Sequence, residues 1–128
     1  MPISQKQKSA YGHWRYKVTA ETGATRTVTP LDFGSIIYND EALAATLPTP
    51  QASFRGAWVK FYTVADAAIT LDCATADKLV VFNDATGSSI VNATAAHLIG
   101  DGYTALCDGS KWLISCHPGD EGITRTVA

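Results

Sequence analysis

The fold of this chain is decided by one stretch near its end, Gly100-Asp101-Gly102-Tyr103-Thr104-Ala105-Leu106-Cys107-Asp108-Gly109-Ser110-Lys111-Trp112-Leu113-Ile114-Ser115-Cys116. It contains two strand-like runs separated by Asp108-Gly109-Ser110. An Asp-Gly pair between such runs is a strong hairpin signal, because glycine accepts the positive φ that tight turns need. With Gly109 and Ser110 at the turn centre, Cys107 faces Trp112 and Tyr103 faces Cys116 across the hairpin.

The rest of the chain shows the same pattern of short apolar runs between Gly, Asp and Asn turn signals. Strands are expected over residues 16–20, 25–29, 35–38, 57–64, 68–73, 78–82 and 89–92. This spacing predicts an all-β fold, a compact antiparallel β-sandwich or barrel-like domain with an extended N-terminal arm and at most one short helical turn. We expect that turn within residues 39–47, where Asn39 or Asp40 would cap it.

Length and charge limit the organisation of the chain. At 128 residues it is long enough for one domain with a core of its own. Charged residues make up 17% of the chain, against about 25% in an average domain, so we expect part of the surface to be buried against another chain. Three stretches are expected: an extended basic arm over residues 1–24, a β domain over 25–118, and a C-terminal tail or last strand over 119–128.

The expected arm is basic and aromatic, whereas the body of the chain is acidic. The first twenty residues include four cations and no Asp or Glu. One interpretation is a solvated tail, and another is that Trp14 packs on the body and Tyr16 begins a strand. The functional interpretation is an arm that docks on an acidic neighbour, since aromatic residues and Arg are enriched in binding hot spots. Its candidate contact residues are Lys6, Lys8, Tyr11, Trp14 and Arg15.

The three cysteines indicate a reducing compartment. The sequence has no apolar run of bilayer length and begins with a polar segment rather than a signal peptide. We therefore expect synthesis in a cytosol, where thiols stay reduced. Cys107 and Cys116 would lie too far apart along the hairpin to bridge, so Cys73, Cys107 and Cys116 are interpreted as small, buried apolar side chains.

The sequence has few of the residue patterns that are typical of catalytic, metal-binding or phosphate-binding sites. The chain has no Cys-x-x-Cys pair for zinc and no phosphate-binding loop. Most acids stand in turn signals, as turn chemistry alone would place them. We therefore predict no enzyme activity, no catalytic residues, no metal and no cofactor. Nucleic acid is not expected as a partner, because the acidic body would repel phosphates, and neither is a membrane.

A series of turns and apolar positions carries a family resemblance. The marks are Val28-Thr29-Pro30, Leu47-Pro48, Phe54-Arg55-Gly56-Ala57-Trp58-Val59-Lys60-Phe61, Gly100-Asp101-Gly102 and Asp108-Gly109-Ser110-Lys111-Trp112. This pattern resembles small β-structured virion proteins of tailed bacteriophages, namely head-decoration (cement) proteins, and is related to head-fibre and tail-fibre modules. The resemblance spans roughly residues 28–114 and implies homotrimers around a three-fold axis with no cofactor.

The resemblance implies a structural virion protein made in the host cytoplasm. We expect a trimeric capsid decoration protein that binds the major capsid protein on the outer surface of the phage head and stabilises the head. The alternative is a receptor- or glycan-binding module of a phage tail fibre. Such a module would need exposed aromatic residues, and Trp58 and Tyr62 are the candidates, because they share one face of a strand.

Overall fold

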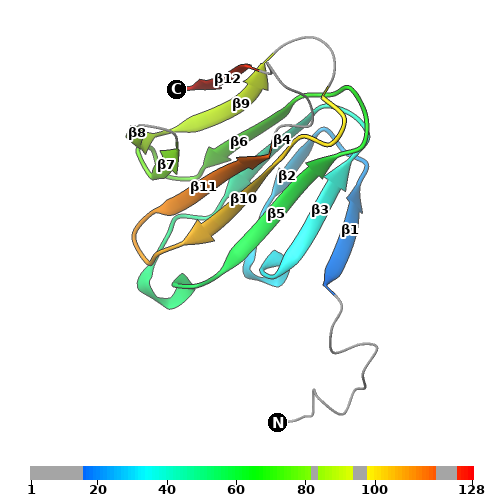
Figure 1. Cartoon of the computed structure of the whole chain (residues 1–128). Coiled ribbons are helices and arrows are strands. Elements are labelled where there is room, and N and C mark those ends of the chain that lie inside the picture. The colour runs from blue at the N-terminus through cyan, green and yellow to red at the C-terminus, as the bar shows by residue number, and fades with distance from the viewer. Residues whose placement is uncertain (1–15, 82–83, 94–97, 118–123) are drawn as a thin grey trace, which may run out of the picture.

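The computed structural model describes residues 16–81, 84–93, 98–117 and 124–128, and these form a two-layered β-sandwich (Figure 1). One layer is a seven-stranded sheet, in spatial order β1 (Lys17–Glu21), β3 (Ser35–Asn39), β5 (Trp58–Thr63), β10 (Gly102–Cys107), β11 (Trp112–His117), β7 (Leu79–Val81) and β8 (Asp84–Gly87). The other is a five-stranded sheet, in order β12 (Thr124–Val127), β9 (Ser89–Ala93), β6 (Ile69–Cys73), β4 (Leu43–Leu47) and β2 (Thr25–Thr27). The predicted all-β sandwich is confirmed.

The first half of the chain winds between the two sheets. Strands β1 to β6 alternate layers, so β1, β3 and β5 pair in parallel in one sheet, and β2, β4 and β6 pair in parallel in the other. Strand pairing is therefore mixed, where antiparallel pairing was expected throughout. Parallel neighbours need a crossover connection, and here a strand in the opposite layer provides it. The later strands are antiparallel to their neighbours, apart from the parallel pair of β11 and β7.

The core lies between the layers and is filled by alternate residues of each strand. In β4, for example, Leu43, Ala45 and Leu47 are buried, while Ala44 and Thr46 are half-buried. The largest fully buried side chains are those of Trp112, Tyr103, Phe61, Ile37, Leu47, Ile69, Leu71, Leu79 and Ile90. This period of two is the pattern of a strand with one face on the core.

The predicted helical turn within residues 39–47 is wrong. Asn39 ends β3, and Leu43–Leu47 is strand β4. The alanines of this segment favour a helix when considered alone, but Leu43 and Leu47 are buried by alternation, which requires extended backbone. Helical turns lie instead at Pro30–Asp32 and Ala52–Phe54, both of the 3₁₀ type.

The predicted hairpin is confirmed in its register. Cys107 is opposite Trp112 and Tyr103 is opposite Cys116. The Asp108 carboxylate closes the turn by accepting hydrogen bonds from the backbone N–H groups of Ser110 at 2.8 Å and Lys111 at 2.7 Å. These two bonds lower the pKa of Asp108. Gly109 has φ +101°, so the hairpin uses glycine where its conformational freedom is needed.

Both ends of the chain contain a strand, near the one expected over residues 16–20 and within the expected tail or last strand over 119–128. Within the segment 1–24 expected to be an arm, residues 17–21 form β1 and pair with β3. Within the segment 119–128, residues 124–127 form β12 and pair with β9 of the same chain. The arm residues Lys6, Lys8, Tyr11, Trp14 and Arg15 lie outside the described residues.

All three cysteines are thiols, and they differ in burial. Cys107 is buried, while Cys73 and Cys116 are half-buried. Burial raises the pKa of the Cys73 thiol, so this group is protonated at neutral pH and a poor nucleophile. The interpretation of the cysteines as buried apolar side chains therefore holds fully for Cys107 and partly for the other two.

Candidate binding face of the seven-stranded sheet

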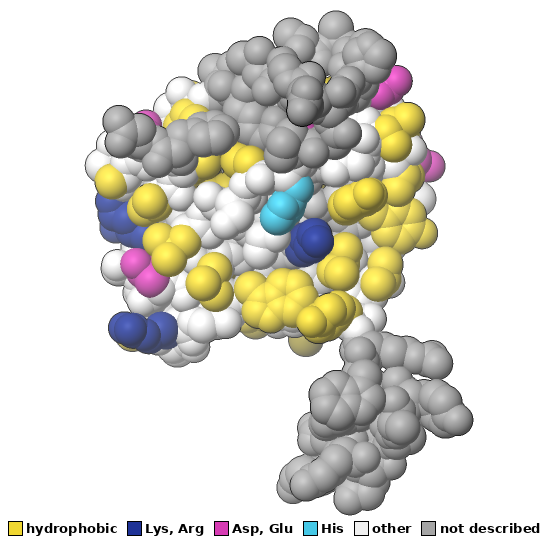
Figure 2. Space-filling view, viewed as in Figure 1, with side chains coloured by type: hydrophobic (Ala, Val, Ile, Leu, Met, Phe, Trp, Pro, Cys, Tyr) yellow, Lys and Arg dark blue, Asp and Glu magenta, His cyan; other side chains and the backbone are white. Residues whose placement is uncertain are grey.

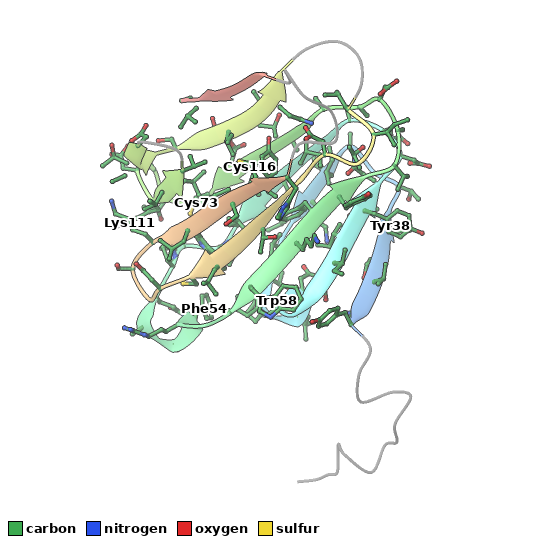
Figure 3. The ribbon with its side chains drawn as sticks, in the orientation of Figure 1. Tyr38, Phe54, Trp58, Cys73, Lys111 and Cys116 are labelled. Atoms are coloured by element: carbon green, nitrogen blue, oxygen red, sulfur yellow. The ribbon has the colours of Figure 1, made fainter. Side chains whose placement is uncertain are left out.

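The seven-stranded sheet turns one face to the core and the other away from it, and we call the second the outer face. On β5 the side chains of Val59, Phe61 and Thr63 are buried, while Trp58, Lys60 and Tyr62 point outward. The strand register places the outward side chains of neighbouring strands in cross-strand rows. Figure 3 labels Trp58, at the start of β5, and Tyr38, near the end of β3.

The first row is apolar. The register pairs Trp58, Leu106, Leu113 and Val80 in this row. Tyr16 and Gly34, one residue before β1 and β3, extend it past Trp58, whose carbonyl oxygen accepts the backbone N–H of Gly34. The ring of Tyr16 meets the ring of Trp58 edge to face, with centroids 5.5 Å apart. Gly34 lies between them in the register and has no side chain, which lets the two rings approach. Tyr16 is 66% exposed, Leu106 42% and Leu113 36%, so this apolar row faces solvent in the isolated chain.

Two further rows place polar groups between hydrophobic ones. The middle row contains Val18, Ile36, Lys60, Thr104 and Ser115, and the third contains Ala20, Tyr38, Tyr62, Gly102 and His117. Figure 2 shows this face with a dark blue and a cyan side chain side by side near its middle and yellow hydrophobic side chains around them. Polar groups are therefore concentrated at the centre, and hydrophobic side chains lie at its margins.

The central polar side chains surround a position without a side chain. Gly102 lies between Tyr62 and His117 in its row. A Cβ at Gly102 would be 2.1 Å from the carbonyl oxygen of Phe61, so the close approach of β10 to β5 admits only glycine there. Thr104 is directly opposite Lys60, and its Oγ1 is 2.8 Å from Nε2 of His117. We call the group of Lys60, Thr104 and His117 the polar centre.

The charge of the outer face is low and positive. Across the three rows, Lys60 is the only Lys, Arg, Asp or Glu. A surface rich in aromatic and aliphatic side chains and poor in charge is typical of the core of a protein interface. The outer face is therefore suited to binding.

A charged cluster stands elsewhere, beside β1 and β2. The Arg26 guanidinium bonds to Glu21 and to Asp32, each at 2.7 Å. Asp32 also accepts the backbone N–H of Thr29 at 3.1 Å. The hydrogen bond from Arg26 lowers the pKa of Glu21. Burial acts to lower the pKa of Arg26, but its bonds to Asp32 and Glu21 outweigh this and raise it. These contacts join the first strands to the Pro30–Asp32 turn, which is a structural role.

Part of the outer face was predicted from the sequence. Trp58 and Tyr62 share the outward side of β5, as predicted from parity, with Trp58 half-buried and Tyr62 40% exposed. Sequence reasoning missed Lys60, which has the same parity, and also missed Leu106 and Leu113, which the hairpin register brings to the same face. Tyr16 and Tyr38 join the face because β1, β3 and β5 pair in parallel. No turn or residue pattern near these strands predicts that pairing.

The described ranges contain neither a metal-binding cluster nor a membrane-spanning helix. Within residues 16–81, 84–93, 98–117 and 124–128, no three His, Cys, Asp or Glu side chains are grouped closely enough to hold a metal ion. No helix in the same ranges has the length and apolar character needed to cross a bilayer.

Comparison with known proteins adds no relatives, since no family model, curated protein or solved structure matches this chain.

Proposed function

We propose that this chain is a structural virion protein, a homotrimeric decoration protein that binds the assembled phage head and stabilises it. Its partner is the major capsid protein, and the outer face of the seven-stranded sheet is the docking surface. The observation that carries the proposal is the composition of this face, in which an exposed row from Tyr16 through Trp58 to Leu113 accompanies a single cation. A face of this kind gains free energy when a second surface removes it from water.

Two marks of the phage-protein resemblance are in contact, and this supports the proposal. The indole of Trp112, in the Asp-Gly-x-x-Trp hairpin, bonds to Pro48, in the Leu-Pro corner. These marks therefore have a common structural purpose, which is to lock the hairpin of one sheet to the end of β4 in the other. A rigid platform loses little conformational entropy when it docks, which suits a protein whose work is to bind.

Head stabilisation then follows from linkage. A protein that binds only the assembled lattice stabilises that lattice by mass action. Three copies held together multiply the effect, because once one copy is docked the others bind at a high effective concentration. The proposed trimer and the proposed docking face therefore work together.

The test uses the purified full chain and heads prepared without it. Light scattering should give the mass of a trimer, and the protein should co-sediment with heads and raise the temperature at which they break open. A monomer that stays in the supernatant would overturn the proposal.

A second candidate is a receptor- or glycan-binding module of a tail fibre. The observation that favours it is the pair Tyr38 and Tyr62, which are opposite each other on the outer face beside the polar centre. Aromatic rings next to hydrogen-bond donors are a common lining of small-molecule sites. Binding to a glycan array, together with absence from heads, would select this function over decoration.

A further inference from the structure

Lys60 limits what can cover the outer face. Its neighbours across the strands are Ile36 on β3 and Thr104 on β10, and the three rows contain no carboxylate to pair with it. Covering an unpaired ammonium group with apolar surface is strongly unfavourable, because the charge loses its hydration without gaining a partner. A partner that buries this face must therefore bring an acceptor to Lys60.

The polar centre offers further hydrogen bonds to that acceptor. Gly102, between Tyr62 and His117 in the register, is buried and packed closely against Phe61, so the acceptor must approach Lys60 from above the sheet. Lys60 lies beside both Tyr62 and Thr104. The hydroxyl of Tyr62, the ammonium group of Lys60 and the hydroxyl of Thr104 are all able to donate hydrogen bonds, and a carboxylate accepts several at once.

We infer that the outer face docks on an apolar protein surface that presents one Asp or Glu carboxylate to the polar centre, where it pairs with Lys60. This inference rests on the proposed function, and it names the chemistry that the capsid protein must present. Trp58, Leu106 and Leu113 of the apolar row lie beside Lys60 on the same face. The partner's carboxylate must therefore be flanked by apolar side chains that cover this row.

The same observations disfavour other occupants. A second copy docked face to face about a two-fold axis through the polar centre would bring Lys60 towards its own counterpart, and like charges repel. A saccharide small enough to cover the polar centre alone would leave Leu106 and Leu113 uncovered, although both are exposed in the isolated chain. A protein surface satisfies both the charge and the apolar row.

The first test removes the charge. Lys60→Met keeps an unbranched side chain and should weaken binding to decoration-free heads about tenfold, whereas Lys60→Arg should retain most of it. The matched control is Lys17→Met, because Lys17 is exposed and has the opposite parity on β1. Binding of the wild-type chain should also weaken with added salt more steeply than binding of Lys60→Met, since salt screens the ion pair.

The second test places an internal carboxylate beside Lys60. Thr104→Glu places an acid directly opposite Lys60, where it should compete with the partner's carboxylate and reduce head binding at least as much as Lys60→Met. The control is Thr104→Gln, because glutamine is as large as glutamate and also removes the threonine hydroxyl that contacts His117, but carries no charge. Thr104→Gln should therefore bind heads more tightly than Thr104→Glu. Thermal melting checks that each variant is folded.

The outcomes separate the inference from the function on which it rests. If the wild-type chain fails to bind heads, the proposed function falls. If it binds and Lys60→Met binds equally well, the decoration role stands and the carboxylate inference is overturned. If the chain binds a sialylated glycan through Lys60 and not the heads, the occupant is a saccharide and both proposals are wrong.

Discussion

The indole N–H of Trp112 donates a hydrogen bond of 2.8 Å to the carbonyl oxygen of Pro48. Trp112 begins β11 in the seven-stranded sheet, and Pro48 directly follows β4 in the five-stranded sheet. The bond therefore crosses the sandwich, between residues that are distant in sequence. The Trp112 ring is fully buried and lies beside Phe33, with ring centroids 6.1 Å apart, so one side chain fills the core and ties the two layers together.

Removing the Trp112 ring should strongly destabilise the fold. Trp112→Ala leaves a large cavity and should lower the free energy of unfolding by about 3–5 kcal/mol. Trp112→Phe keeps part of the ring but leaves the Pro48 carbonyl without its donor, which costs about 1–3 kcal/mol. Urea unfolding followed by fluorescence of the remaining tryptophans measures both. Equal stability of Trp112→Phe and the wild type would show that the hydrogen bond contributes nothing.

Adding one methyl group at Gly102 should disrupt the seven-stranded sheet. The new Cβ would lie 2.1 Å from the Phe61 carbonyl oxygen, and backbone atoms cannot yield cheaply. We expect Gly102→Ala to lose more stability than the about 1–3 kcal/mol typical of overpacking, measured by thermal melting. The control is Gly56→Ala, where the Cβ meets nothing within 4 Å and only the φ of +89° opposes it. That variant should lose about 1–2 kcal/mol.

The contact between Glu21 and Arg26 should make stability dependent on pH in the acidic range. The pKa of Glu21 is lowered in the folded chain, so the folded state favours the carboxylate. Its contribution is complete above the pKa of the unfolded state, about 4.3, and is lost as the pH falls through the lower folded value.

Substituting Glu21 separates this contribution from the rest of the chain. Glu21→Gln should be less stable than the wild type by about 0.2–1 kcal/mol at neutral pH. The difference should vanish in strong acid, where the wild-type carboxyl is also protonated. Denaturant midpoints measured across the acidic range test this. A difference that stays constant with pH would mean that the carboxylate charge has no part in it.

A charge placed in the apolar row should separate docking from folding. Leu113 is 36% exposed on the outer face, so Leu113→Glu should change stability by about 0.5 kcal/mol or less. It should nevertheless weaken binding to decoration-free heads, because the glutamate would be buried against the partner. Ser53→Glu, at an exposed position outside the three rows, is the control. Equal binding of both variants in a sedimentation assay would remove the apolar row from the docking surface.

The parts of the fold that could be predicted from the sequence are those fixed by local turn residues. Asp108 and Gly109 fix the hairpin, and its register follows from counting residues outward from the turn. The segment around Leu43 was misassigned because alanine favours helices, while its burial alternates as in a strand. Propensity is local, but burial is decided by the neighbouring strands.

The candidate site depends on pairings that local patterns do not encode. Trp58 and Tyr62 were found by strand parity alone. The contact of Tyr16 with Trp58 needs β1 and β3 to pair in parallel, and nothing near either strand specifies which sheet it joins. Lys60 gains its significance only from the absence of carboxylates on neighbouring strands, and this becomes visible once the order of the strands is known.

The alternation of the first six strands between layers has a consequence for how such chains can change in length. Each circuit adds one strand to each sheet and stacks on the circuit before it, with β1 and β2 at its open end. Duplicating or deleting the outermost circuit, β1 with β2, would lengthen or shorten the sandwich sideways and leave the hydrogen bond between Trp112 and Pro48 in place. The N-terminal edge of the sandwich is thus a spacer of adjustable width attached to a fixed closing unit.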